Sequence, residues 1–193
     1  ALALASTLLL GGCASGSRNQ MIISTADQKM VLLRDGKPTR SFPVSTSKFG
    51  LGDSRGSYAT PLGKLRVRKK IGGDMPAGTV FKGRIPTGEV LPVNAPGRDP
   101  IVTRILWLEG LEARNRNAFA RYIYIHGTPE ERNIGQPVSF GCIRMRSCDV
   151  IELFDSIGVN AQVFVTPKPL PRELAQISES QSKASSQGDH RRL

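Results

Sequence analysis

Short apolar stretches separated by turn residues run through most of this chain and predict a fold built mainly from β-strands. The first three form a meander pattern, in which the dipeptide Asp35-Gly36 is a typical hairpin turn. Mostly strands with one helix favour a single β-rich domain. The predicted strands cover residues 21–25, 30–34, 39–45, 64–69, 79–82, 101–108, 121–125 and 161–165.

One segment, residues 147–157, has the apolar spacing of an amphipathic helix instead. Ser147 stands where an N-cap is expected, and Gly158 stands where a helix of this length would end. We therefore predict one helix there. Its apolar residues fall on one face: Val150, Ile151, Phe154 and Ile157.

The N-terminal residues have the pattern of a targeting segment. Their small and apolar residues match the core of a signal peptide and are too few to span a bilayer. The sequence LGGC, which ends at Cys13, resembles a bacterial lipobox, in which the cysteine is acylated. We expect residues 1–12 to be a signal peptide with a truncated start, and residues 13–19 to be a lipidated cysteine with its tether. The alternative is that Cys13 lies buried in an apolar strand.

These boundaries leave residues 20–167 as one folded domain, which is long enough to bury a core. Residues 168–193 are rich in Pro, Ser and Gln, and we expect them to be disordered apart from a weak helix near 172–177. The lipid anchor predicts a secreted protein of the cell envelope, held at the membrane on its periplasmic side.

The formal charge of +11 and the pI of about 10.1 suggest an anionic partner, although such a charge also serves solubility alone. Aromatic residues make up 6% of the chain, and none stands in a basic stacking motif of the RNA-binding kind. Nucleic acid is therefore not an expected partner.

His126 and Cys142 are the candidates for chemistry. His126 ends a predicted strand before the turn Gly127-Thr128-Pro129, whereas the other histidine lies in the predicted tail. Cys142 stands between Gly141, which permits close approach of a substrate, and the cation Arg144 two residues on. We expect this setting to lower the thiol pKa, and a Cys–His pair is the minimum for acyl transfer through a thioester.

Other chemistries fit the sequence less well. Ser45 and Lys48 match the S-x-x-K pattern of penicillin-binding proteins, but so does a segment of the tail, and the partner motifs of that class are missing. A zinc site needs about three protein ligands, and only one histidine lies in the predicted domain, so we expect no metal or other cofactor. Cys148 would either form a disulfide with Cys142 or remain a half-buried thiol at the helix start.

Taken together, the motifs resemble one known family. His126-Gly127-Thr128 followed by S-x-G-C-I-R-M from Ser139 is similar to the signature of the L,D-transpeptidase (YkuD-type) catalytic domain. The opening hairpin near residues 27–37 and the turn Thr60-Pro61-Leu62-Gly63 resemble further parts of that domain, so the resemblance spans roughly residues 20–166.

The resemblance implies a β-sandwich or barrel-like fold and a cysteine acyltransferase of the peptidoglycan layer. Cys142 would attack a stem tetrapeptide with His126 as general base and acid, and D-alanine would leave. Gly127, Ser139, Gly141 and Arg144 would support the site, with the amides of Gly141 and Cys142 as an oxyanion site. Ser139 is expected to hydrogen-bond within the site.

Residues around His126 and Cys142 have expected roles as well. Arg144 would orient the loop or bind a substrate carboxylate, or else form a structural salt bridge. Phe140 occupies a position that some members of the family fill with a polar residue. Residues 71–100, rich in Gly and Pro, would form a lid over the cleft.

The resemblance also sets the expected partners and the alternatives. The partners are peptidoglycan stem peptides, or a protein that becomes attached to the wall, and carbapenems would acylate Cys142. If water resolved the thioester, the protein would be an L,D-carboxypeptidase or an amidase. The non-enzymatic alternative is a wall-binding lipoprotein.

Overall fold

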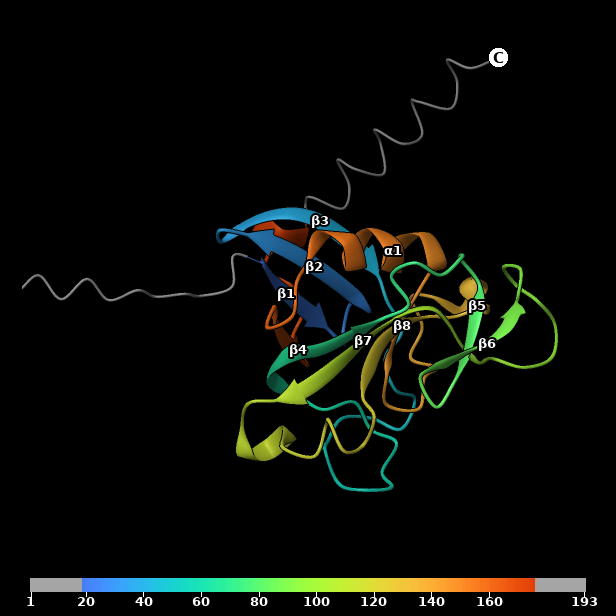
Figure 1. Ribbon diagram of the computed structural model, residues 1–193. Coiled ribbons are helices and arrows are strands. Elements are labelled where there is room, and N and C mark those ends of the chain that lie inside the picture. The colour runs from blue at the N-terminus through green and yellow to red at the C-terminus, as the bar shows by residue number, and fades with distance from the viewer. Residues whose placement is uncertain (1–18, 176–193) are drawn as a thin grey trace, which may run out of the picture.

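The computed structural model describes residues 19–175, which form one mixed sheet of ten strands with one main α-helix (Figure 1). The prediction of a mainly β fold with one clear helix is therefore confirmed. The strands are β1 (Asn19–Ser24), β2 (Lys29–Arg34), β3 (Lys37–Pro43), β4 (Gly63–Ile71), β5 (Thr79–Lys82), β6 (Ile85–Val90), β7 (Ile101–Gly110), β8 (Tyr124–Gly127), β9 (Ile143–Met145) and β10 (Gln162–Thr166); the helix is α1 (Ser147–Ser156), and the 3-10 turns are η1 (Ala113–Asn115) and η2 (Glu131–Asn133).

The last strand joins the two parts of the sheet. The order of the strands is β3-β2-β1-β10-β4-β7-β5-β6, while β8 pairs with β7 and β9 pairs with β8. Strands β1 to β3 form the predicted antiparallel meander, and β10 lies parallel to β1 and antiparallel to β4. The meander is therefore connected to the rest of the sheet through β10.

The main core lies between α1 and the sheet, where apolar residues of eight strands and the helix meet. Leu106 and Leu108 of β7 and Leu153 of α1 are fully buried. Because β7 is covered on both faces, its sequence is an almost continuous apolar run rather than an alternating one.

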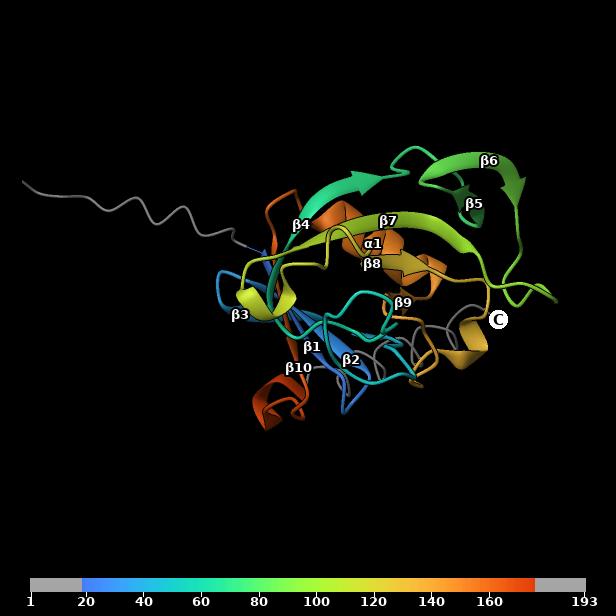
Figure 2. The same cartoon turned by 90° about the horizontal axis from the view of Figure 1, so that it is seen from below.

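Strand β7 pairs with two different strands along one of its edges. It pairs with β4 over residues 105–110 and with β5 at residues 101–102, while β8 occupies its other edge. The register with β8 shifts between Val102 and Ile105, where Thr103 has a φ of 72°, an unusual value for a β-branched residue. Figure 2 shows that the β5–β6 hairpin lies at the opposite end of the molecule from β1–β3.

Several predicted details are wrong. The strand predicted over 121–125 begins only at Tyr124, because Tyr122 has a φ of 59° and turns the chain. The N-cap of α1 is Arg146 and no side chain caps it, while Ser147 Oγ lies 2.8 Å from Thr103 Oγ1. The C-cap is Ile157, which is extended, so Gly158 is not the terminator that we expected.

The apolar face of α1 also differs from the prediction by one residue. Leu153 is fully buried, whereas Ile151 is only half-buried. Strands β6 and β9 were not predicted, since β6 is largely exposed and β9 has only three residues.

The folded part extends past the predicted boundary at residue 167. Leu170 packs with Val31 and Leu33 of β2, and its N–H donates to Asp27 Oδ2 over 2.6 Å. The predicted weak helix begins as expected, since residues 172–175 are helical. The predicted signal peptide, Cys13 and the rest of the predicted tail lie outside the described residues. None of the helices within residues 19–175 has both the length and the apolar character that a membrane-spanning segment needs.

The burial of β7 generates a test. Leu108→Ala should lower the free energy of unfolding by about 3 kcal/mol, because it leaves a cavity in the core. The matched control is Leu111→Ala, since the Leu111 side chain is 48% exposed, and it should cost less than about 0.5 kcal/mol. Urea unfolding of both variants measures the difference, and equal losses would contradict this account of the core.

Candidate active site

The parallel pairing of β8 with β9 brings the two predicted catalytic residues to one face of the sheet. Ile125 lies opposite Ile143, and His126 lies opposite Arg144. Both isoleucines are fully buried in the core. Because successive side chains of a strand alternate between faces, His126 and Cys142, which directly precedes β9, point to the opposite side from this core.

His126 is buried and held in one orientation. Its Nδ1 lies 2.8 Å from the carbonyl oxygen of Gly127. Burial lowers the imidazole pKa to about 4, with the cation of Arg144 acting in the same direction and the Gly127 carbonyl opposing it. The ring is therefore neutral at neutral pH. With its Nδ1–H donated to the carbonyl, Nε2 is left as the proton acceptor.

Gly127 is needed for close packing at this point. A Cβ there would lie 2.7 Å from the backbone oxygen of Val102 and 3.0 Å from Cβ of Thr103. Gly127 thus supports the site twice, since its carbonyl orients His126 and its lack of a side chain lets β8 approach the start of β7.

The thiol of Cys142 is half-buried between backbone groups of the preceding loop and β8. Sγ accepts a hydrogen bond from the N–H of Tyr124 and donates one to the carbonyl of Tyr122, both over 3.4 Å. Burial raises the thiol pKa to about 11, although the Tyr124 N–H and the cations of Arg144 and Arg121 act to lower it. The expected lowering of this pKa is therefore wrong, because the lost hydration of the thiolate outweighs the nearby cations.

Ser139 fixes the loop that carries the thiol. Its Oγ donates to the carbonyl of Cys142 over 2.6 Å and accepts from the N–H of Gly141 over 3.3 Å. Gly141 has a φ of 113°, and its carbonyl accepts from Thr60 Oγ1. Ser139 thus bonds within the site as expected, and the N–H of Gly141, predicted as an oxyanion donor, is already engaged.

Arg144 forms the salt bridge that was one of its two predicted roles. Its Nη1 lies 2.6 Å from Asp99 Oδ2, and the two side chains are 10% and 16% exposed. Thr128 Oγ1 donates to the other carboxylate oxygen. Sequence reasoning missed Asp99, because it stands in a Gly- and Pro-rich loop with no pattern that marks it.

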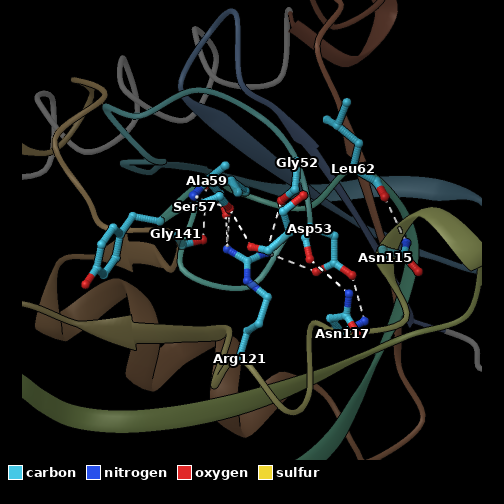
Figure 3. A network of polar contacts seen from close by, with 12 residues as sticks. Gly52, Asp53, Ser57, Ala59, Leu62, Asn115, Asn117, Arg121 and Gly141 are labelled. Carbon is cyan, nitrogen blue, oxygen red and sulfur yellow. Dashed lines mark hydrogen bonds and ion pairs between the residues drawn. The ribbon is translucent and has the colours of Figure 1, made fainter.

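A cavity of about 450 Å³ opens beside Cys142. One wall is fixed by Arg121, whose guanidinium bonds to Asp53 and to carbonyl groups of the loop at residues 52–59 (Figure 3). Arg121 and Asp53 are both more than 90% buried as side chains. Sequence analysis did not predict this network, since residue 121 was placed in a strand. The cavity is lined by Arg55, Gly56, Tyr58, Ala120, Arg121, Tyr122, Ile123, Phe140 and Cys142.

The tip of the β5–β6 hairpin reaches the same region. Arg84 Nη1 donates to Tyr124 Oη over 3.2 Å, and the guanidinium lies 4.8 Å from the ring centroid of Trp107 and 4.9 Å from that of Tyr122. This hairpin belongs to the segment predicted to form a lid. Its position suits a lid, and its movement stays a prediction.

Cys142 and Cys148 are both free thiols, and Cys148 is exposed, so no disulfide joins them. Ser45 of the S-x-x-K pattern is fully buried and donates to the carbonyl of Asn133, which gives it a structural role. Within residues 19–175, no three His, Cys, Asp or Glu residues are grouped as metal ligands would be.

The ion pair of Arg144 generates a stability test. Asp99→Ala should lower the free energy of unfolding by about 3 kcal/mol, because it leaves a buried cation without its partner. Glu89→Ala removes the partner of Arg98 in an exposed pair, and it should cost less than about 1 kcal/mol. Urea unfolding at neutral pH compares them, and a similar loss in both variants would refute a special role for Asp99.

The raised thiol pKa generates a pH test. Since only the thiolate reacts, alkylation of Cys142 by iodoacetamide should be slower than that of glutathione at about pH 8 and should still be rising above about pH 9. Peptide mapping by mass spectrometry separates Cys142 from the other cysteines. A rate that reaches its plateau below about pH 8 would show that the thiol pKa is lowered instead.

Comparison with known proteins identifies the same family as the sequence motifs. The model of the L,D-transpeptidase catalytic domain family, YkuD, matches residues 18–165. The Bacillus subtilis (strain 168) protein named Putative L,D-transpeptidase YqjB is 40% identical over 60 residues, which are 31% of this chain and 32% of that protein. The chain thus spans about a third of this curated relative.

Solved structures of the same class share the fold. The L,D-transpeptidase LdtMt1 in complex with imipenem has a TM-score of 0.50 at 19% identity, with 78% of this chain and 60% of that chain covered. An L,D-transpeptidase from Mycobacterium smegmatis has a TM-score of 0.51 at 18% identity, with 78% and 59% covered. Since the family model covers most of its length, this chain belongs to the L,D-transpeptidase (YkuD) catalytic domain family.

Proposed function

We propose that this protein is a cysteine L,D-transpeptidase that cross-links peptidoglycan stem peptides through a thioester on Cys142. The observation that carries the proposal is the placement of His126 and Cys142 on one face of paired strands, with the thiol in the wall of a cavity. Family membership supports the reaction class, and the geometry supports these two residues as its nucleophile and base.

In the first half of the reaction, Cys142 Sγ attacks the carbonyl between the third and fourth residues of a donor stem. His126 Nε2 accepts the thiol proton as the C–S bond forms. The tetrahedral intermediate then expels D-alanine, whose amine takes that proton from His126. A thioester to Cys142 and a neutral imidazole remain.

In the second half, the amine of another stem attacks the thioester. His126 takes a proton from the attacking amine and returns it to the departing sulfur, which restores the thiol. The new bond is an amide between the two stems. A water molecule in place of the amine would give hydrolysis, which is the carboxypeptidase or amidase alternative, through the same thioester.

The electrostatics of the site favour a neutral thiol and a neutral imidazole at rest. The thiol pKa is raised to about 11 and the imidazole pKa is lowered to about 4, so an ion pair is not formed before substrate binds. We therefore expect the proton to move together with the attack, when negative charge passes from sulfur to the carbonyl oxygen. The amide of Cys142 is our candidate to receive it.

Similar solved structures support a second proposal, which is acylation by a carbapenem. One of the similar solved structures is an L,D-transpeptidase in complex with imipenem, and another carries a faropenem-derived adduct. We infer that a carbapenem also acylates this protein, at Cys142.

We also propose that this protein acts at the membrane. A lipid on Cys13 would hold the domain at the membrane, on the side where peptidoglycan is cross-linked. The acceptor is either the amine of a second stem or the amine of a protein to be attached to the wall, according to which of them binds beside the thioester.

The test uses the full chain with a purified disaccharide-tetrapeptide, and mass spectrometry identifies the products. Wild type and Cys148→Ala should both release D-alanine and form cross-linked dimers. Cys142→Ala should lose at least about a thousandfold in rate, as loss of a nucleophile does. Imipenem should add its mass to the wild-type protein and not to Cys142→Ala.

Each other result has a defined meaning. Tripeptide without dimers would replace transpeptidation by the carboxypeptidase alternative. Turnover that persists in Cys142→Ala would remove this residue as the nucleophile. No turnover and no imipenem adduct in wild type would favour the wall-binding lipoprotein.

A further inference from the structure

Three exposed aromatic rings form a cluster at the cavity beside Cys142. Phe49, Tyr58 and Phe140 lie with ring centroids 5.4 to 6.0 Å apart, and they are between 50% and 56% exposed. The ammonium of Lys48 lies 4.5 Å from the centroid of Phe140 and 5.3 Å from that of Phe49. We call Phe49, Tyr58 and Phe140 the aromatic platform.

The aromatic platform is continuous with the proposed site. Tyr58 and Phe140 line the same cavity as Cys142, and Phe49 contacts both rings without lining the cavity. The platform therefore leads from the thiol out to the surface. A ligand held at Cys142 and long enough to leave the cavity would pass over it.

The backbone holds these rings in place. The N–H of Lys48 donates to the carbonyl of Ser139 over 3.1 Å, which ties the loop of Phe49 to the loop of Phe140. Tyr58 has a φ of 53°, and its carbonyl accepts from Ser47 Oγ over 2.5 Å. A bulky residue rarely adopts this conformation, and such strain is typical of functional sites.

The exposed aromatic side chains are not scattered over the surface. Of the five exposed aromatic residues within 19–175, Tyr58, Tyr122 and Phe140 line this cavity, Phe49 contacts two of these rings, and Phe164 alone lies elsewhere. Single exposed apolar residues are ordinary, but a cluster beside a reactive group marks a binding surface.

We propose that the aromatic platform binds a pyranose ring of the glycan to which the donor stem is attached. This inference rests on the proposed function. A stem peptide of alanine, glutamate and a diamino acid contains no ring, whereas each sugar presents a flat face of C–H groups. Such C–H groups carry partial positive charge and pack on the negative face of an aromatic ring.

The surrounding charges fit the rest of that ligand. Lys48 stands over the platform and Arg55 lines the cavity, so both can meet the carboxylates of a stem that runs from the sugar to Cys142. The three rings then select the glycan-linked form of the substrate over a free peptide.

The experiment compares a disaccharide-tetrapeptide with the free tetrapeptide, both as donors for the full chain. Phe49→Ala should raise KM for the disaccharide-tetrapeptide about tenfold, the loss typical of truncating an aromatic contact, and leave its kcat unchanged. KM for the free tetrapeptide should not change. Phe49→Tyr retains a ring and should behave as wild type.

Phe164→Ala is the matched control, because it removes an exposed ring from β10, away from the cavity. It should leave both KM values unchanged. Phe49→Leu keeps an apolar side chain of similar size without a ring face. It should raise KM for the disaccharide-tetrapeptide only. Equal effects of Phe49→Ala on both donors, or no effect on either, would overturn the proposal, and the former would assign the platform to the peptide.

Calorimetry distinguishes this proposal from the proposed function. Wild type and Phe49→Ala are titrated with the disaccharide alone, which carries no scissile bond. Weaker binding to Phe49→Ala supports the platform even if neither donor is turned over, in which case only the proposed reaction fails. Identical titrations together with unchanged KM values would reject the platform while leaving the reaction intact.

Discussion

The parallel hydrogen bonding of β8 with β9 is the constraint on which the site depends. It sets Ile125 opposite Ile143 in the core, and the alternation of side chains then sends His126 and Cys142 to the other face. A shift of one residue in this register would turn the side chains of this candidate pair into the core and the isoleucines away from it. The apolar core and the candidate active site are therefore specified by the same few residues.

Burial governs the electrostatics of this face. It keeps both the imidazole and the thiol neutral at rest; the guanidinium of Arg144 acts with burial on the imidazole and against it on the thiol. Asp99 lies against Arg144 and so offsets part of the charge that would otherwise act on the pair. Asp99 belongs to the segment between β6 and β7, so this segment contacts β9 through the ion pair, while the β5–β6 hairpin contacts β8 through Arg84 and Tyr124.

Sequence alone predicted the β-rich class, most strands and the helix, because local patterns carry that information, and a short motif marked His126 and Cys142 as the candidate pair. It failed where the outcome depends on contacts between distant segments. Arg121 was placed in a strand because it precedes an apolar run, yet its bonds to the loop at residues 52–59 hold it in a turn. The direction of the thiol pKa was wrong for the same reason, since neighbouring residues indicate cations but do not reveal burial.

The position of β10 has a consequence for the order in which the molecule can form. The strands β1 to β3 come first in the chain, yet they reach β4 only through β10, which comes last among the strands. A chain that emerges from its N-terminus can form the meander early, but β1 and β4 are joined within the sheet only when β10 arrives. Pairings this far apart in sequence are slow to form. The complete sheet can therefore form only after the last strand of the domain has been made.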